Sequence, residues 1–126
     1  MLSEKSISGF DIKKGLIKFN SDRKLYSDIL SAYVTNVGYM LSNIEFYSID
    51  HCTGVELKQY VIDIHGIKNI SYDIYANQVA DMAKNLETAA VNRDLEYIKE
   101  NNPILVKTVK SLLFDINAFI AEQNNN

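Results

Sequence analysis

The chain has 126 residues, of which 47% are hydrophobic and 23% are charged, enough for one domain with an apolar core and too few for two ordinary domains. Its net charge of -3 gives no basic surface for a nucleic-acid backbone, so we expect no nucleic-acid partner. No apolar run approaches the ~20 residues of a membrane span, the start lacks the pattern of a signal peptide, and the single cysteine, Cys52, cannot form an internal disulfide. We therefore expect a cytoplasmic protein with no membrane contact.

Two helices are predicted in the first third of the chain. The segment GFDIKKGLIKF indicates a short helix from about Ile12 to Phe19 that closes one end of a bundle. A long helix follows a cap at Ser21 or Asp22, because apolar residues then recur at intervals of three and four. The predicted inward residues of the long helix are Leu25, Ile29, Tyr33, Val37, Met40, Ile44 and Tyr47.

Two further helices occupy the middle of the chain. Thr53 and Glu56 have the spacing of a capping box, in which each side chain bonds the backbone of the other. The helix that they begin has an inward stripe of Leu57, Tyr60, Ile64, Ile67, Ser71 and Ile74. The next helix runs from about residue 77 to 92, with Val79, Met82, Leu86 and Ala89 or Ala90 inward.

The last part of the chain is predicted as a broken helix. A short helical piece, DLEYIKE, is expected to end at Pro103, which also suits the first turn of a new helix. The inward residues of that final helix are Leu105, Val109, Leu112, Leu113, Ile116, Phe119 and Ile120, and residues 123–126 are expected to fray. Together these patterns predict one all-α domain over residues 1–126, an antiparallel helical bundle with an ordered core over about 9–120.

A polar group interrupts the apolar pattern of the helix VIDIHGIKNISYDI. Successive helical residues turn by ~100°, so with Ile64 inward His65 lies on the flank, partly facing water, and Lys68 is its neighbour one turn on. Ile62, Gly66 and Asn69 are expected further round, on the outer side. A histidine at the edge of a bundle is most often only a solvated polar residue. A neutral imidazole is also a good phosphoryl acceptor near pH 7, and a nearby cation offsets the charge that arrives.

The segment HGIKNISYDIYA, from His65, followed by a helix ending in Asn85-Leu86-Glu87, resembles the histidine-containing phosphotransfer (HPt) domain. Members of that family show H-x-x-K-G, a Gly-Ala break and a helix ending in Leu-Glu. The segment GFDIKKGLIKFNSDRKLYSDIL is similar to the family's start, so the resemblance extends from about Gly9 to Ile120. It implies an up-down four-helix bundle, here with the short N-terminal helix and the broken C-terminal helix predicted above.

The resemblance also implies a function. His65 would accept a phosphoryl group from an aspartyl phosphate on a receiver domain and pass it to another receiver, as a phosphocarrier and not a turnover enzyme. Lys68 would stabilise the phosphoryl charge, and Glu87 would orient the imidazole through its other nitrogen. No cofactor would bind this chain; Mg²⁺ would belong to the receiver. Partners would be receiver domains and a hybrid sensor kinase, met by a monomer, and the residues expected around the docking site are Ile62, Gly66, Asn69, Tyr72 and Lys84.

The sequence departs from the family pattern at two places and leaves alternatives open. Asn69 stands where the family has glycine after the lysine, and Tyr75-Ala76 stands at the Gly-Ala break, so a bulky residue occupies a turn that favours positive φ. Asn69 favours the alternative of a helical adaptor that binds a receiver or kinase without carrying phosphate. His51 and Cys52 are adjacent and lack zinc-ligand spacing, so no metal site is predicted, and a small helical enzyme or metal protein is the remaining alternative.

Overall fold

The computed structural model describes residues 10–45 and 54–124. These residues form five helices: α1 (Ile12–Lys18), α2 (Arg23–Glu45), α3 (Gly54–Asp73), α4 (Asn77–Val91) and α5 (Leu95–Asn124). No β-strand occurs within the two described stretches. The prediction of an all-α protein is confirmed.

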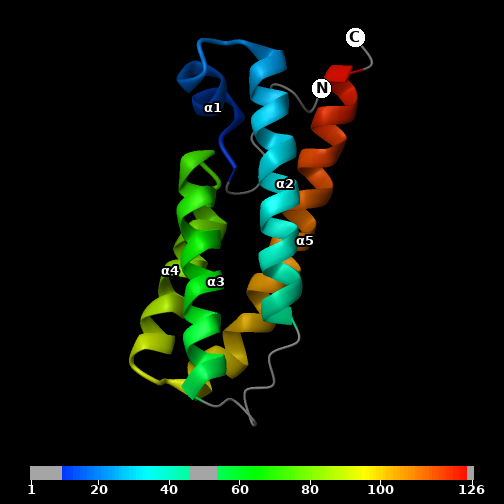
Figure 1. Cartoon of the computed structure of the whole chain (residues 1–126). Helices are drawn as coiled ribbons and strands as arrows, with labels where there is room; N and C mark the ends of the chain where they lie inside the picture. Colours follow the sequence, from blue (N-terminus) through cyan, green and yellow to red (C-terminus); the bar gives the residue numbers. More distant parts are fainter. Residues whose placement is uncertain (1–9, 46–53, 125–126) are drawn as a thin grey trace.

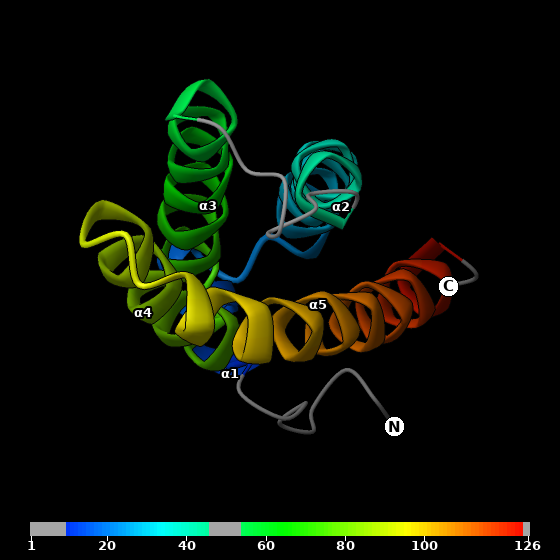
Figure 2. The ribbon, with the colours of Figure 1, turned by 90° about the horizontal axis from the view of Figure 1, so that it is seen from below.

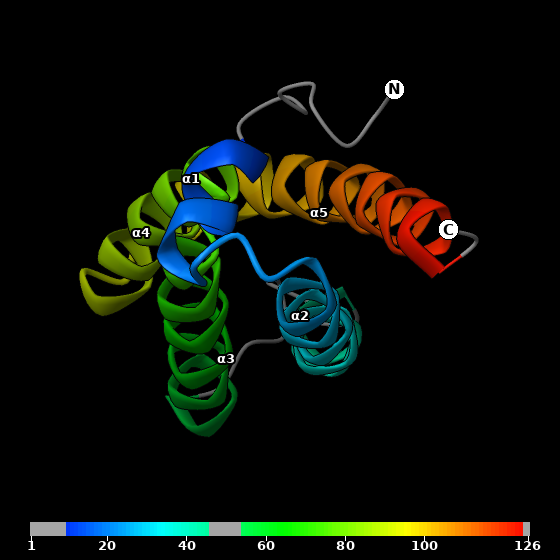
Figure 3. The same ribbon diagram turned by 90° about the horizontal axis from the view of Figure 1, so that it is seen from above.

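The four long helices pack around one apolar core (Figure 1). α2 contacts α3 and α5, and α4 contacts the same two helices, so the long helices enclose the core between them. The views along the helices show α1 lying across one end of this helical packet (Figures 2 and 3). The largest fully buried side chains come from the four long helices and from Phe10: Phe10, Tyr26, Leu30, Ile44, Tyr60, Ile64, Ile67, Leu86, Ile98, Leu105, Ile116 and Phe119.

Two aspartates begin the first two helices. Asp11 Oδ1 accepts a hydrogen bond from Lys14 N, and Asp22 Oδ1 accepts one from Leu25 N, both at 3.0 Å. Each carboxylate satisfies a backbone donor that a helix start would leave unpaired. Of the two predicted caps of the long helix, Asp22 is therefore the one confirmed.

The predicted inward face of α3 is confirmed in full. Its six predicted residues, Leu57, Tyr60, Ile64, Ile67, Ser71 and Ile74, are all buried. Most of the predicted faces of α4 and α5 are buried as well, with Met82, Leu113 and Ile120 packed against the core at its margin. A regular spacing of three and four thus located the core side of these helices.

The start of α2 differs from the prediction. Leu25 is 44% exposed, whereas Tyr26 and Leu30 are fully buried and take the inward positions. α1 explains the difference, because a Cβ on Gly15 would lie 2.3 Å from Tyr26 Oη: the missing side chain lets α1 rest directly on the tyrosine ring. Phe119 covers the same ring edge-on, with ring centroids 6.0 Å apart. Tyr47 and Thr53, from the predicted stripe and capping box, lie outside the described residues.

The predicted break in the C-terminal helix is wrong, because α5 continues through Pro103. Pro103 lacks the N–H that would bond the carbonyl of Lys99, but both residues are exposed, so water can solvate that carbonyl. Ile98, Leu105 and Val106 are buried on either side and hold both halves of the helix against the core. Tertiary packing thus overrides the local preference of proline.

α5 extends into the tail for which fraying is predicted. α5 includes Gln123, and its Oε1 accepts a hydrogen bond from Arg23 Nη1 at 3.3 Å. This contact ties the end of α5 to the start of α2. Residues 125–126 lie outside the described residues.

α1 holds the turn between α3 and α4. Tyr75 has φ of 62°, the left-handed conformation that glycine adopts more readily. Its carbonyl accepts a hydrogen bond from Asp11 N at 3.1 Å. Lys18 Nζ donates to the carbonyl of Asp73 at 2.9 Å and lies 5.8 Å from the centre of the Tyr75 ring. These contacts stabilise a turn in which tyrosine takes the place of glycine.

Candidate functional site

His65 lies on the edge of α3 that faces α4, at the surface of the helical packet. Its side chain is 53% exposed, although the preceding residue, Ile64, is fully buried. The prediction that His65 lies on the flank of the helix and partly faces water is confirmed. A partner molecule can therefore reach the imidazole without any rearrangement of the core.

Glu87 of α4 bridges two residues of α3. His65 Nδ1 donates to Glu87 Oε2, and Lys68 Nζ donates to Glu87 Oε1 at 2.7 Å. The Lys68 and Glu87 side chains are 19% and 18% exposed, so this ion pair is more protected from water than the imidazole. The predicted contact between Glu87 and the histidine is confirmed.

The contacts of the ring favour one tautomer. Asn69 lies one turn after His65, and its Nδ2 is 2.9 Å from Nε2 of the imidazole. An amide nitrogen only donates, so Nε2 accepts this hydrogen bond and carries a lone pair. Nδ1 then carries the proton and donates it to the carboxylate of Glu87. In this tautomer the nucleophilic nitrogen is Nε2.

The pKa of the Glu87 carboxyl is lowered from its ordinary value. Partial burial opposes ionisation, but it is outweighed by hydrogen bonds from Lys68 and His65 and by the positive charge of Lys68 and of the imidazole when it is protonated. Glu87 is therefore a carboxylate at neutral pH. A carboxylate at Nδ1 raises the basicity of the opposite ring nitrogen and stabilises positive charge that develops on the ring.

A second contact defines how α3 and α4 align. Tyr72 Oη donates to Asp81 Oδ1 at 2.5 Å. His65 of α3 pairs with Glu87 of α4, whereas Tyr72, later in α3, pairs with Asp81, earlier in α4. The two helices thus run antiparallel here. By the same alignment Asn69 lies level with Lys84, and Ile62 lies level with Val91.

Exposed apolar side chains therefore lie at one end of the histidine site. Ile62 is 63% exposed and Val91 is 66% exposed. The sequence analysis does not predict Val91 as part of this surface. An antiparallel alignment of the two helices, which places Val91 opposite Ile62, is the signal that could have identified it. At the other end of the site, Tyr72 and Lys84 are exposed as well.

Gly66 does not lie where the sequence analysis placed it. A Cβ at this position would be 2.5 Å from Met40 Sδ of α2, so the glycine lies under a side chain of the bundle and not on an open outer surface. Its small size lets Met40 pack over α3. Partner access at this position is a weaker explanation for glycine than packing between α2 and α3.

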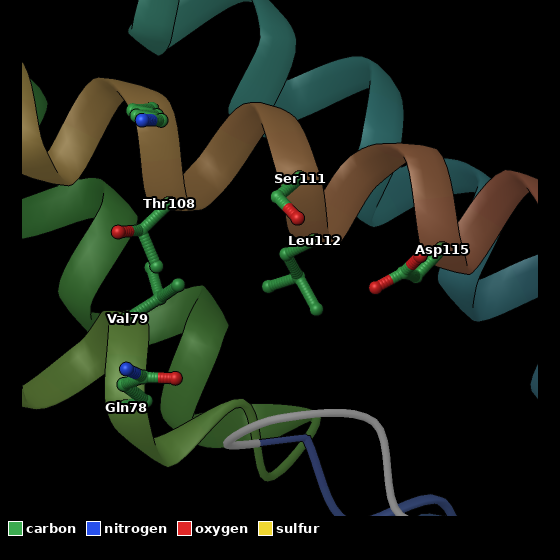
Figure 4. Close-up of a pocket in the computed structure, with 7 residues that line it drawn as sticks. Gln78, Val79, Thr108, Ser111, Leu112 and Asp115 are labelled. Atoms are coloured by element: carbon green, nitrogen blue, oxygen red, sulfur yellow. The ribbon is translucent and has the colours of Figure 1, made fainter.

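The imidazole of His65 lies at the open surface of the helical packet, with 53% of its side chain exposed. A pocket of about 240 Å³ lies elsewhere, between α4 and α5, with Thr108, Ser111 and Asp115 along one side of α5 (Figure 4). The other lining residues are Gln78, Val79, Lys107 and Leu112. His65 is not among them. A reactive side chain on an open surface suits a macromolecular partner better than a small substrate, which needs enclosure.

Two further classes of site are absent from the described parts of the chain. No three histidine, cysteine, aspartate or glutamate side chains among these residues are grouped so that they could hold a metal ion. No helix in the same residues combines the length and the apolar character needed to cross a membrane. His51 and Cys52 lie outside the described residues.

Comparisons of the chain with protein-family models, with curated proteins and with solved structures give no match. The geometry of the site and the sequence motifs carry the functional argument.

Proposed function

We propose that this protein is a histidine phosphocarrier, which accepts a phosphoryl group on Nε2 of His65 from a receiver-domain aspartate and passes it to another receiver. The observation that carries the proposal is the state of the ring. The side chain is 53% exposed, its Nδ1 contacts the carboxylate of Glu87, and Nε2 is the ring nitrogen that lies away from that carboxylate. A nucleophile oriented by a second group in this way is the arrangement that covalent catalysis requires.

The transfer step balances with the groups present. The Nε2 lone pair forms a bond to phosphorus, the bond between phosphorus and the aspartyl oxygen breaks, and the aspartate leaves as a carboxylate with the bonding electrons. The ring then carries an Nδ1 proton and a phosphorylated Nε2, and Glu87 stabilises the positive charge that the ring gains. Transfer to the second receiver is the reverse reaction at a different aspartate.

Lys68 supplies positive charge one helical turn after His65. Its ammonium is paired with Glu87, which also holds His65, so the lysine partly neutralises the carboxylate in the resting protein. The arriving phosphoryl group brings negative charge one helical turn away, where an ammonium is a suitable partner. We assign to Lys68 the role of offsetting that charge.

The arrangement of the helices supports the same assignment. We propose that α2 to α5 form the up-down four-helix bundle of the HPt family, in one domain, with α1 closing one end. The contacts between neighbouring long helices and the position of His65 on α3 opposite Glu87 of α4 agree with the motifs that carry the resemblance. We further propose a monomeric, cytoplasmic protein without nucleic-acid or membrane partners.

The surface around His65 suits a receiver domain as partner. Ile62 and Val91 provide apolar contact area on one side, and Tyr72 and Lys84 provide polar contacts on the other. Exposed apolar residues beside a reactive group favour docking of a protein surface. We propose that the receiver covers these residues and brings its own Mg²⁺ and aspartate to Nε2.

The alternative is an adaptor that docks on a receiver or kinase through the same surface and never carries phosphate. The contact of Asn69 with Nε2 favours it, because this hydrogen bond uses the lone pair that phosphorylation needs. The two functions predict the same binding surface and differ in covalent chemistry.

Transfer of label from a phosphorylated receiver tests the proposal. The protein is incubated with a ³²P-labelled receiver and Mg²⁺, and we expect an acid-labile, alkali-stable label on the wild type that is absent from His65→Gln. His51→Gln is the matched control, because His51 is the other of the two histidines in the chain, and this variant should keep the label. Label retained by His65→Gln would contradict the assignment, and a wild type that binds receivers but takes no label from them would favour the adaptor.

A further inference from the structure

We propose that Asn69 is a gate on the phosphoryl acceptor: its side-chain amide holds the lone pair of His65 Nε2 in the resting protein and must release it before a phosphoryl group can enter. This inference rests on the proposed function and adds a regulation of the same site. It predicts that the resting protein accepts phosphate more slowly than its exposed imidazole alone would allow.

The geometry that carries the inference is a hydrogen bond on the reactive atom itself. Asn69 Nδ2 lies 2.9 Å from Nε2, a normal length for such a bond, and the other ring nitrogen is held by Glu87. Both ring nitrogens are thus engaged, one by a carboxylate and one by an amide. The two hydrogen bonds have opposite effects on the reactivity of the ring. The bond to Glu87 makes the ring more nucleophilic, whereas the bond from Asn69 occupies the lone pair that would attack phosphorus.

The gate opens by rotation of one exposed side chain. Asn69 lies one turn after His65 on the same helix, and its side chain faces solvent, so it can turn away without disturbing the core. Once the nitrogen–phosphorus bond has formed, Nε2 has no lone pair to accept a hydrogen bond. The amide must then bond a phosphoryl oxygen or water.

Two features of asparagine can slow the reaction, and two substitutions separate them. Asn69→Ala removes both the amide donor and the bulk of the side chain. Asn69→Leu removes the donor but keeps a side chain of similar size. Asn69 is exposed, so neither change should disturb the fold, which circular dichroism and thermal unfolding will verify for each variant.

A small phosphoryl donor isolates the gate from receiver docking. With phosphoramidate, the lone pair of Nε2 attacks phosphorus, the phosphorus–nitrogen bond of the donor breaks, and ammonia departs with the bonding electrons. We expect phosphohistidine to form about fivefold faster in both variants than in the wild type, the factor expected for loss of one neutral hydrogen bond. ³¹P NMR follows the product, and His65→Gln gives the background.

The state of the ring supplies a readout that needs no phosphate. In ¹⁵N-labelled protein above the titration range of the ring, the Nε2 resonance should show an acceptor nitrogen in all three proteins. It should move downfield in both variants, toward the position of a lone pair without a donor. An unchanged Nε2 resonance in both variants would overturn the contact and with it the gate.

The kinetic outcomes separate the gate from the proposed function. Equal rates for wild type and both variants would overturn the gate and leave the phosphocarrier function standing. A faster Asn69→Ala with Asn69→Leu no faster than wild type would also overturn it, since bulk and not the hydrogen bond would then be responsible. If no protein formed phosphohistidine with phosphoramidate or with a phosphorylated receiver, the proposed function itself would fail.

Discussion

Two polar clusters on α3 lie little more than one helical turn apart and differ in almost every physical respect. In the first, Tyr60 Oη donates to Asn102 Oδ1 at 2.7 Å, and Asn102 Nδ2 donates to the carbonyl of Ile44 at 3.1 Å. These side chains are buried and join α2, α3 and α5. The second is the exposed cluster of His65, Glu87, Lys68 and Asn69 between α3 and α4.

The difference shows that one helix can contribute to stability through one cluster and to reactivity through another. The amide of Asn102 uses its donor and its acceptor inside the protein, so the buried cluster fixes the relative position of three helices and presents nothing to a partner. The exposed cluster also pairs its polar atoms, but half of the imidazole surface stays open to water. Breaking the first cluster should therefore destabilise the fold, and breaking the second should alter its reactivity.

The largest effect is expected from Asn102→Leu, which tests the structural half of this comparison. The substitution removes the hydrogen bonds that Asn102 makes with the Tyr60 hydroxyl and the Ile44 carbonyl in the buried interior, and the loss of such a bond to a buried group costs about 1–3 kcal/mol. We expect the free energy of unfolding to fall by about 3 kcal/mol, measured by urea denaturation.

Asn101→Leu is the matched control for this loss. Asn101 is next in the chain, and its Nδ2 bonds the carbonyl of Tyr97 within α5, so it joins no second helix. We expect a loss below about 1 kcal/mol for this variant. Equal losses for the two variants would show that the buried cluster has no special part in stability.

The buried cluster is also where prediction from sequence reached its limit. Spacing of three and four located the inward face of α3, because burial of a stripe leaves a period in the sequence. It could not reveal that Asn102 is buried, since the partners that satisfy its amide come from residues 42 and 58 positions away in the chain. The continuous helix through Pro103 was missed for the same reason, because packing of distant segments decided it.

The exposed cluster was easier to predict from sequence than the core cluster. His65 and Lys68 share a helix, so their relation follows from helical geometry alone. Glu87 came from a resemblance of motifs, and the structure confirms its contact with the ring. The contact of Gly66 with Met40 and that of Asn69 with Nε2 depend on side-chain conformation and on the approach of α2, which no local pattern encodes.

Lys68→Ala tests the role of the exposed cluster in phosphoryl transfer. We expect its effect, expressed as a free energy, to be smaller than that of Asn102→Leu on stability. Loss of the ammonium leaves the carboxylate of Glu87 and the incoming phosphoryl group with less compensation, so we expect label transfer from a phosphorylated receiver to slow by about tenfold. Stability should change by less than about 1 kcal/mol, because the pair lies at the surface.

Lys58→Ala is the control for Lys68→Ala. Lys58 is an exposed lysine earlier on α3, away from the imidazole, so its loss changes the net charge of the protein by the same amount. We expect this variant to transfer label at the wild-type rate. If the two lysine variants behaved alike, the effect would belong to overall charge and not to the site.

The smallest effect, from Glu87→Gln, concerns how the exposed cluster responds to pH. Glutamine keeps a hydrogen-bond acceptor for His65 and Lys68 but removes the charge. Because the pKa of Glu87 is lower in the folded protein than in the unfolded chain, the carboxylate stabilises the fold above the unfolded pKa of about 4.3. That contribution disappears as pH falls through the folded value. We expect the wild type to be about 0.5 kcal/mol more stable than Glu87→Gln at pH 7, with the difference vanishing as acid protonates the carboxylate.

Urea denaturation of both proteins from pH 7 to pH 3 measures this difference, and the Lys68→Ala background tests its origin. Lys68 contributes the leading hydrogen bond that lowers the pKa of Glu87, so without the lysine the pH-dependent part should shrink. A stability difference that stayed constant with pH would show that the carboxylate gains nothing from its two partners. Such a result would remove the physical basis for treating Glu87 as the group that holds the ring in its reactive tautomer, and His65 would have to be oriented by Asn69 alone.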